Sequence, residues 1–428
     1  MCIRDSTLQV LGEAMDPQRY ATGDYYCRIG PERYRITPAD PQADLMPISE
    51  IVSIAFAGGE HIEEISQKYI GGCHYDFETS RLVWEGDTLV HHWGVWGYPM
   101  RVESVLLKSA GIGAVVTLEE HRKQGLMAWA AQESFAAMRA VGYDVSILRG
   151  RHYYKFGYRR AWNYMTTKLN PAHKPPEPLP EFALKSAYRP LRPEDMAQIT
   201  ALYNRQYADV SGSCVRPTYP MLADGETGIH VWFEGDQLAG YVRAIPAEDK
   251  TVLQCLEAAG DPEQGLAVLR ELLEQHGCKE LHFFTLPQSH PILQMVRRGA
   301  CTVEDRYFYH TGWQIKIIHL AAALAKLVPL FEVRLASSHL AGWQGRLALD
   351  AGDQSAVLEI DRGAVHVTDG GSKHSVQAGP ALGRLLIGSD DPEEIIRQED
   401  ILLSGQAGEL AGVLFPNLHP MMSHYDEF

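Results

Sequence analysis

The stretch "VVTLEEHRKQGLMAWAAQESFAAMRAVGYD", residues 115–144, contains an abrupt change in composition. Its first residues end an apolar, strand-like run; a cationic "HRKQG" segment follows, and an apolar-periodic helix begins near Leu126. Helix N-termini already carry a positive partial charge, so cations there cost stability unless an anion binds. Arg122, Lys123 and Gly125 therefore predict an anion site between a strand and a helix.

The predicted anion is a diphosphate. The strand "GIGAVVTL" leads into the segment, Gly125 permits close backbone approach, and unpaired helix N–H groups converge beside Arg122 and Lys123. The chain has no G-x-x-x-x-G-K-[ST] loop, and "GIGAVV" lacks the third glycine of the dinucleotide fingerprint. The alternative for "HRKQG" is a solvated loop with incidental charges.

The segment from Arg122 to Met127 resembles the acetyl-CoA motif R/Q-x-x-G-x-G/A of the GCN5-related N-acetyltransferase superfamily, with Met127 in place of the usual small residue. The resemblance implies acetyl-CoA as co-substrate, with the strand backbone pairing with the pantetheine arm and the loop backbone holding the diphosphate. The cofactor-binding residues implied in this way are Val115, Val116, Thr117, Arg122, Lys123, Gln124, Gly125, Leu126, Met127, Ala128, Leu148 and Arg149.

A second segment, "VSILRGRHYYKFGYRR" (residues 145–160), predicts a strand followed by a polar turn and the aromatic run "YYKFGY". In the superfamily, a tyrosine four residues before a glycine donates a proton to the leaving thiolate of CoA. That position is Tyr153, with Gly157 and Tyr158 completing the pattern. A phenol remains protonated at neutral pH, which suits this role. The alternative for Tyr153 is packing, as expected for Tyr154.

The chain contains indications of an internal duplication. Tyr-Arg strands at Tyr34 and Tyr188 each precede an amphipathic helix, and Gly-Asp hairpin turns recur at Gly86 and Gly235. The second copy begins the corresponding helix with "DPEQG", around Glu263, and has no arginine there to hold a phosphate. Nor does its "HPILQMVRRGA" contain the tyrosine, so we expect this copy to be a scaffold.

The predicted fold class is a mixed α+β chain with two tandem acetyltransferase-type domains, the second degenerate, and a third α+β domain. The proline-rich linker "NPAHKPPEPLPEF" separates the first two, and alternating strands begin near Leu335. The combination resembles the enhanced-intracellular-survival (Eis) type, whose third domain is similar to sterol carrier proteins. The predicted domains are 1–170 (catalytic), 183–314 (degenerate) and 315–428 (sterol-carrier-like).

In that family the chain ends at the active site, and the terminal carboxylate is the general base for the acceptor amine. The resemblance implies this role for Phe428, the last residue of "YDEF". Asp426 or Glu427 as the base is one alternative, and a frayed, solvated tail is another.

Composition limits the classes of function. The formal net charge of −15 argues against a general nucleic-acid binder or a polybasic membrane surface, and it favours cationic ligands. Seven scattered cysteines without a C-x-x-C pair predict free thiols, and no apolar run is long enough to span a membrane, so we expect a cytoplasmic protein. We expect no metal, because His91 and His92 lack a third ligand at a sensible spacing.

The predicted function is transfer of an acetyl group from acetyl-CoA to an amine of a small polycationic molecule (aminoglycoside-like) or to a lysine side chain. The alternative is a non-enzymatic acyl-CoA sensor or lipid-binding scaffold. The expected partners are the acceptor and further copies of the chain, a hexamer by family resemblance, with no nucleic acid and no membrane. The acceptor is not fixed by the sequence, and residues 1–6 match no pattern.

Overall fold

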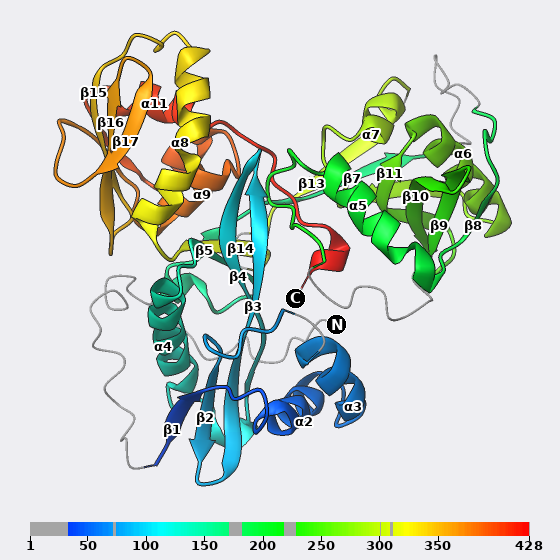
Figure 1. Ribbon diagram of the computed structural model, residues 1–428, viewed down its shortest axis with the longest axis horizontal. Helices are drawn as coiled ribbons and strands as arrows, with labels where there is room; N and C mark the ends of the chain where they lie inside the picture. The colour runs from blue at the N-terminus through cyan, green and yellow to red at the C-terminus, as the bar shows by residue number, and fades with distance from the viewer. Residues whose placement is uncertain are drawn as a thin grey trace.

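The structure is a computed structural model that describes residues 33–71, 74–170, 182–217, 228–299, 301–308 and 311–427. These residues form three β-sheets with helices on their faces (Figure 1). The predicted mixed architecture of two similar units followed by an α+β unit is confirmed. Among the described residues, no helix combines the length and the apolar character needed to cross a membrane.

The first sheet has the strand order β1-β2-β3-β4-β5-β14-β6, in which β4 and β5 are parallel and all other neighbours are antiparallel. Its strands are β1 (Arg35–Pro38), β2 (Arg81–Glu85), β3 (Thr88–Val102), β4 (Val105–Thr117), β5 (Val145–Arg149), β14 (Trp313–Ile317) and β6 (Arg159–Arg160). Its helices are α2 (Leu45–Phe56), α3 (Ile62–Glu64), the π-helix η1 (Ile65–Ile70), η2 (Glu119–His121), α4 (Leu126–Ala140) and η3 (Tyr154–Phe156). We call strands β1–β5 with α2 and α4 the first unit.

The second sheet has the order β13-β7-β12-β11-β10-β9-β8. Its strands are β13 (Thr302–Arg306), β7 (Tyr164–Leu169), β12 (Glu280–Phe284), β11 (Val252–Gly260), β10 (Gln237–Pro246), β9 (Ile229–Glu234) and β8 (Tyr188–Pro190). Its helices are η4 (Pro193–Asp195), α5 (Met196–Gln206), α6 (Pro262–Gln275) and α7 (Pro291–Val296). Strands β8–β12 repeat the order of β1–β5, with the same antiparallel neighbours and a final parallel pair, so we call β8–β12 with α5 and α6 the second unit.

Two strands pair in a different sheet from the one expected from their place in the predicted domains. The domain boundaries themselves stay a prediction. Strand β7 precedes residue 170, yet it pairs with β12 and β13 in the second sheet. Strand β14, which spans the predicted boundary at 314, returns to the first sheet and pairs with β5 and β6. The two sheets are therefore tied together by exchanged strands as well as by the linker.

The third unit (residues 320–414) contains the sheet β17-β16-β15-β18-β19. Its strands are β15 (Gly345–Asp350), β16 (Ser355–Asp361), β17 (Ala364–Thr368), β18 (His374–Gln377) and β19 (Leu402–Ser404). Its helices are α8 (Leu320–Ala336), η5 (Gly379–Ala381), α9 (Leu382–Ile387), α10 (Pro392–Gln398) and α11 (Ala407–Leu414). Its core is continuous with the first sheet, because Ile147 and Ile315 lie in one buried cluster with Leu382.

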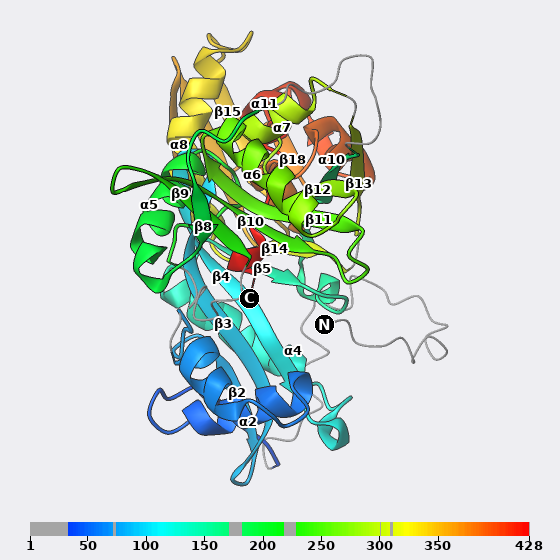
Figure 2. The same cartoon turned by 90° about the vertical axis from the view of Figure 1, so that its right-hand side faces the viewer.

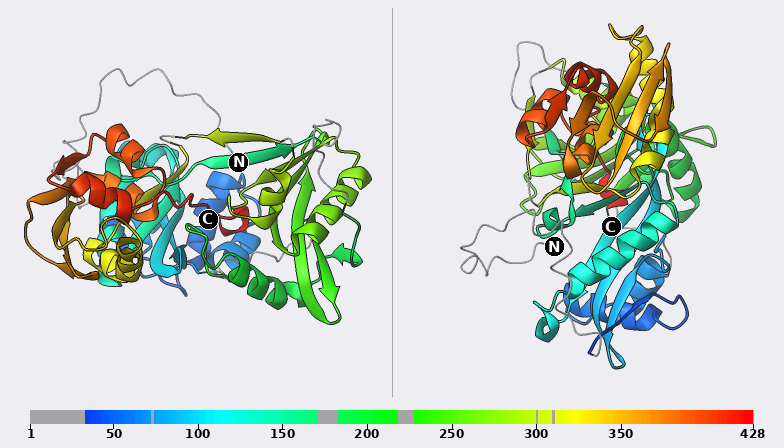
Figure 3. Two further views of the ribbon diagram at one scale, coloured as in Figure 1. Left: turned by 90° about the horizontal axis from the view of Figure 1, so that it is seen from above. Right: turned by 90° about the vertical axis from the view of Figure 1, so that its left-hand side faces the viewer.

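The final segment, residues 415–427, leaves the third unit and runs to the second unit, ending in the short helix η6 (His424–Asp426) (Figures 1 and 3). We call this segment the tail. It brings the end of the chain between the first and second units, close to the ends of β5 and β14 (Figure 2).

Candidate active site

The first unit contains an opening between its two parallel strands. Pairing between β4 and β5 ends at Ile112 and Leu148, after which β5 continues beside β14 and β4 continues beside β3 alone. The segment Val115–Thr117, predicted to bind the cofactor, lies on this free part of β4. A strand edge without a neighbour presents backbone hydrogen-bonding groups to a ligand. An extended pantetheine arm fits such an edge.

The loop 122–125 enters α4 in a conformation suited to an anion. Lys123 (φ 62°) and Gly125 (φ 84°) are both left-handed, and no side chain caps α4. The first turn of α4 contains no acidic residue, so its unpaired N–H groups and positive dipole end are left uncompensated by side chains. Arg122 is tied to the end of β4 by a hydrogen bond of 3.2 Å from its Nε to the Thr117 carbonyl.

Tyr153 lies directly before η3 and packs into the aromatic core of the first unit. Its ring centroid lies 5.9 Å from that of Trp93 and 6.3 Å from that of Tyr158. Gly150 has a φ of 153°, and a Cβ there would lie 2.7 Å from Tyr153 Cε2, so this turn needs a glycine. Burial raises the pKa of Tyr153 above its ordinary value, which keeps the hydroxyl protonated at neutral pH.

The structure brings Tyr153 into one cluster with part of the predicted cofactor residues, namely Val115, Leu126, Met127, Ala128 and Leu148. Val115, Met127 and Tyr153 all border the hydrophobic core between the first sheet and α4. Tyr154 instead packs under a guanidinium, with Arg159 Cζ 3.6 Å from its ring centroid, in line with the packing role expected for it. Of the two tyrosines, Tyr153 is the one that packs in the cluster with Val115 and Met127.

Phe428, the predicted base, lies outside the described residues. The preceding residue, Glu427, has its Oε2 3.5 Å from Nη1 of Arg149, at the end of β5. Arg149 Cζ also lies 5.4 Å from the ring centroid of Tyr164. The chain therefore returns, across 278 residues of sequence, to the strand that leads into Tyr153.

The two sequence alternatives for the base differ in their surroundings. Asp426 is fully buried and accepts hydrogen bonds of 3.1 Å from Arg216 Nε and Tyr203 Oη. Glu427 keeps 19% of its side chain exposed. The Asp426 carboxylate is thus already occupied by hydrogen bonds from Arg216 and Tyr203.

Two histidines, His91 and His92, form hydrogen bonds to the free part of β4. The sequence did not predict these bonds. His92 donates from Nδ1 to the Ala114 carbonyl at 2.7 Å and accepts at Nε2 from Tyr75 Oη at 2.7 Å. Ala114 is left-handed (φ 45°), at a bulge where the register of β3 against β4 shifts. Burial lowers the pKa of His92 to about 4, so the ring is neutral and holds this bulge. A bulge of this kind leaves no periodic signal in the sequence.

His91, on the other face of β3, bonds through Nδ1 to Thr117 Oγ1 at 2.8 Å. The two rings therefore lie on opposite faces of β3, next to the opening, and do not point toward a common ligand. Within the described ranges, no group of three or more histidine, cysteine, aspartate or glutamate side chains is arranged to hold a metal ion.

The corresponding places in the second unit are filled by the protein's own side chains. Asp261 caps α6 by accepting from the Glu263 N–H at 2.9 Å, and Lys185 Nζ bonds both residues at 2.7 and 2.6 Å. At the end of β11, the Ala258 carbonyl accepts from His290 Nε2 at 2.9 Å. The cap and the filled strand edge leave the second unit without the open backbone groups of the first.

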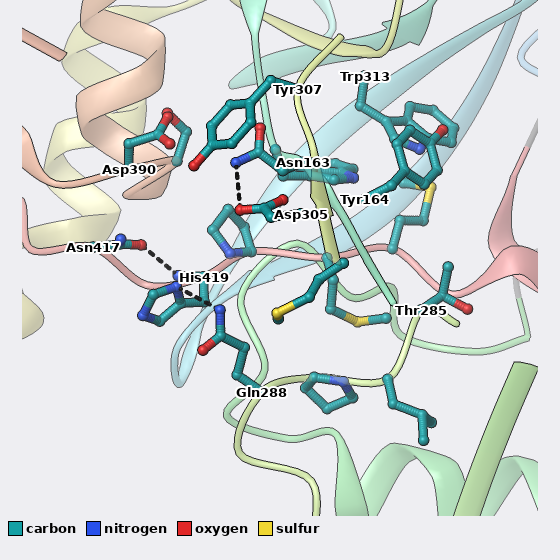
Figure 4. A pocket seen from close by; sticks show the side chains of 18 of the residues that line it. Asn163, Tyr164, Thr285, Gln288, Asp305, Tyr307, Trp313, Asp390, Asn417 and His419 are labelled. Carbon is teal, nitrogen blue, oxygen red and sulfur yellow. Dashed lines mark hydrogen bonds between the residues drawn. The ribbon is translucent and has the colours of Figure 1, made fainter. Parts of the chain in front are cut away.

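Two hollows lie away from these residues. One, of about 170 Å³, lies where the second sheet, the third unit and the tail meet; in Figure 4 its polar wall includes Asn163 beside Asp305 and Gln288 beside His419. The other is an open groove of about 630 Å³ lined by Tyr98 and neighbours. Neither is lined by Tyr153 or the loop 122–125.

Comparison with known proteins agrees with this geometry. Residues 54–161 match the family model described as "Acetyltransferase (GNAT) domain". The matched range contains β3, β4, the loop 122–125 and Tyr153. This range of the chain is therefore similar to a GNAT acetyltransferase domain. No curated protein matches the chain.

Solved structures share the fold over nearly the whole chain. A GCN5-related N-acetyltransferase from Anabaena variabilis is 16% identical with a TM-score of 0.69, covering 91% of this chain and 99% of that one. One from Kribbella flavida is 17% identical with a TM-score of 0.68, covering 92% and 98%. Eis1 from Mycobacterium abscessus is 18% identical with a TM-score of 0.65, covering 90% and 97%. At these identities the likeness establishes the fold.

Proposed function

We propose that the protein is an N-acetyltransferase that moves an acetyl group from acetyl-CoA directly to an amine. The observation that carries the proposal is the opening between β4 and β5, which is flanked by the uncapped start of α4 and by Tyr153. The GNAT family match over the same residues supports it.

The residues around the opening fit acetyl-CoA. The free edge of β4 would pair with the pantetheine arm, and the backbone of the loop 122–125 with the first turn of α4 would bind the diphosphate. Arg122, Lys123 and Arg149 would add positive charge near the phosphates, and Leu148 would contact the cofactor from β5. Acetyl-CoA supplies the activated acetyl group, so no covalent enzyme intermediate is needed.

The proposed roles of the catalytic residues follow from proton balance. A neutral amine nitrogen attacks the acetyl carbon, and the terminal carboxylate of Phe428 accepts the one proton that this nitrogen loses as the amide forms. As the C–S bond breaks, the sulfur leaves as a thiolate, and Tyr153 donates its hydroxyl proton to it. Holding amine and thioester side by side supplies much of the rate.

The proposed acceptor is an amine of a small polycationic molecule, aminoglycoside-like, or a lysine side chain. The net charge of −15 favours cations of either kind. The sterol-carrier-like character of the third unit and assembly into a homo-oligomer belong to the same proposal by family resemblance. A cytoplasmic location belongs to it because of the scattered cysteines and the apolar pattern of the sequence.

The rival function is a non-enzymatic acyl-CoA sensor or lipid-binding scaffold. A panel of aminoglycosides, polyamines and lysine peptides, tested with acetyl-CoA and a thiol-reactive dye, separates the two. The proposal predicts amine-dependent release of free CoA and a mass increase of one acetyl group on the acceptor. Tight acetyl-CoA binding without CoA release for any amine would favour the sensor.

A further inference from the structure

The tail leaves the third unit, where the Leu418 N–H donates to the Gly388 carbonyl at 2.9 Å, and its last residues bind the second unit. Met421 donates its N–H to the Ser211 carbonyl at 2.9 Å, and His419 Nδ1 lies 3.1 Å from Gln288 Nε2. Gly212, at a φ of 83°, would place a Cβ 2.8 Å from the Met421 nitrogen, so the tail approaches this turn too closely for any side chain. Met422 lies in the buried cluster that the first sheet shares with the third unit, and Glu427 reaches Arg149 at the end of β5.

A buried ion network lies under the end of the tail. Arg216, 3% exposed, donates to both carboxylate oxygens of Glu257 at 2.8 and 2.6 Å and from Nε to Asp426 at 3.1 Å. Both carboxylates are buried almost completely. Tyr203 Oη donates to Asp426, and the Ser423 hydroxyl donates to Glu257. Every charge in the network therefore has a partner from another segment of the chain.

Such a network is better suited to fixing a position than to adding stability. Desolvating three charged groups costs about as much as their attraction returns, whereas removing one partner leaves a buried charge uncompensated. A tail seated in any other register would lose the Asp426 contact and leave Arg216 half satisfied. The network thus specifies one placement of the tail.

The network lies at the position in the second unit that corresponds to the opening between β4 and β5 in the first unit. Strand β11 pairs with β12 as far as Cys255 and Phe283, so Glu257 lies two residues beyond the last pair. In the first unit, the residue two beyond the last β4–β5 pair is Ala114, on the part of β4 that faces the opening. Where the first unit leaves room for a cofactor, the second unit places a carboxylate that binds Arg216 and the tail.

We propose that the second unit is a docking site for the chain end, and that Arg216, acting through Asp426, is a positioning residue for the terminal carboxylate. The catalytic part of this proposal rests on the proposed function, in which that carboxylate is the base. Phe428 is two residues beyond Asp426, so the backbone between them spans at most about 7 Å. Fixing Asp426 would therefore restrict the volume in which that carboxylate can lie.

The first test compares two charge-neutralising, near-isosteric substitutions in the second unit. Asp426→Asn removes the negative charge with which the tail binds Arg216, and it leaves Arg216 paired with Glu257. Asp195→Asn is the matched control, because Asp195 is also a buried partner of an arginine, Arg189 (2.7 and 2.9 Å), but does not touch the tail. We expect kcat to fall about 10²-fold in Asp426→Asn with an unchanged KM for acetyl-CoA, as for a misplaced catalytic group. Asp195→Asn should keep wild-type kcat.

The second test requires no turnover. Carboxypeptidase A removes an accessible C-terminal phenylalanine, and release of Phe428 from the folded protein is followed by mass spectrometry. We expect Asp426→Asn to release Phe428 at least tenfold faster than the wild type and Asp195→Asn, at a temperature where all three are folded by circular dichroism. Equal release rates together with wild-type kcat in Asp426→Asn would overturn the proposal.

The two tests also separate this proposal from the proposed function. If the wild type acetylates no amine, the proposed function fails, and the digestion alone then supports or overturns the docking of the tail. If the wild type is active and Asp426→Asn is equally active and equally resistant, acetyl transfer stands and the positioning role of Arg216 falls.

Discussion

Helices α4 and α6 occupy the same place in two copies of one fold, each following the first strand of a parallel pair, and they begin in opposite ways. Helix α4 has no side-chain cap and no acid in its first turn, and the loop before it contains left-handed Lys123 and Gly125. Helix α6 has Asp261 as its cap and Glu263 in its first turn. The difference leaves backbone N–H groups available to a ligand at the start of α4, whereas the protein's own side chains satisfy them at α6.

The edges of β4 and β11, the strands that precede these two helices, differ in the same way. In each unit a neutral histidine forms a hydrogen bond to a backbone carbonyl: His92 to Ala114 at the bulge of β4, and His290 to Ala258 at the end of β11. His92 belongs to the neighbouring strand and leaves the β5 side open, whereas His290 begins α7 and covers the edge of β11. The same interaction supports an open edge in one unit and closes it in the other.

The largest expected effect comes from the chain end, which we propose acts in catalysis at the first unit and docks on the second. Adding a short C-terminal tag converts the carboxylate of Phe428 into a peptide bond, so kcat should fall near the upper end of the 10²–10⁴-fold range of general acid–base catalysis, about 10³-fold or more. Deleting Phe428 should also damage catalysis.

Two matched proteins serve as controls for the chain end. Phe428→Leu keeps the terminal carboxylate, and an N-terminal tag leaves the tail untouched, so both should retain most of the activity. If Glu427 were the base, Glu427→Gln would inactivate the enzyme and the extended form would remain active.

Tyr153→Phe should produce the next largest effect. The substitution removes the proton donor and keeps the ring that packs on Trp93, so acetyl-CoA affinity should persist while kcat falls about 10²-fold, at the lower end of the range, because a thiolate leaves partly unaided. Steady-state kinetics measure the change, with Tyr154→Phe as the control. Wild-type kcat in Tyr153→Phe would show that another group protonates CoA.

The cofactor loop should give a smaller effect, on affinity. Arg122→Glu or Gly125→Trp should raise the KM for acetyl-CoA by about 10- to 100-fold, the range expected for losing a charge-assisted hydrogen bond worth about 1.5–3 kcal/mol. Glu263→Arg in the second unit should leave this KM unchanged, because α6 is capped whichever charge stands there. An equal response to substitutions in both loops would break the comparison between the units.

The smallest effect concerns stability in acid. Burial lowers the pKa of both His92 and His290 to about 4, below the value of about 6.5 for an unfolded chain. Between these two pH values the unfolded state therefore binds more protons than the folded state. The free energy of unfolding is highest above pH 6.5 and decreases as the pH is lowered toward 4, by about 3 kcal/mol for each histidine.

Urea unfolding at pH 7, 5.5 and 4.5 measures this loss. His92→Gln should remove about half of the loss that the two histidines cause, and His366→Gln, a substitution at an exposed position, serves as the control. A stability independent of pH across this window would contradict the neutral, carbonyl-bonded state of both histidines.

The sequence predicted the features of the molecule that depend on residues close together in the chain. The change from an apolar strand to "HRKQG" and a helix located the loop 122–125, and the spacing to Gly157 located Tyr153, because these features lie within a few residues of one another. The repeated strand order was also visible as a recurrence of turns and helices along the chain.

What the sequence did not reveal depends on contacts across long separations. The pairing of β14 with β5 and the ion pair of Arg216 with Asp426, 210 residues apart, leave no local signal. The bulge at Ala114 likewise depends on how β3 registers against β4 and not on the type of residue. The tail therefore suggested three bases on sequence grounds, and the burial of Asp426 distinguishes it from Glu427.

The central claim is that one unit binds acetyl-CoA and the other holds the chain end. Calorimetric titration of the wild-type protein with CoA tests it most directly. The account predicts one binding site per chain, weakened in Arg122→Glu and unaffected in Glu263→Arg. Two sites per chain, or undiminished binding in Arg122→Glu, would contradict it.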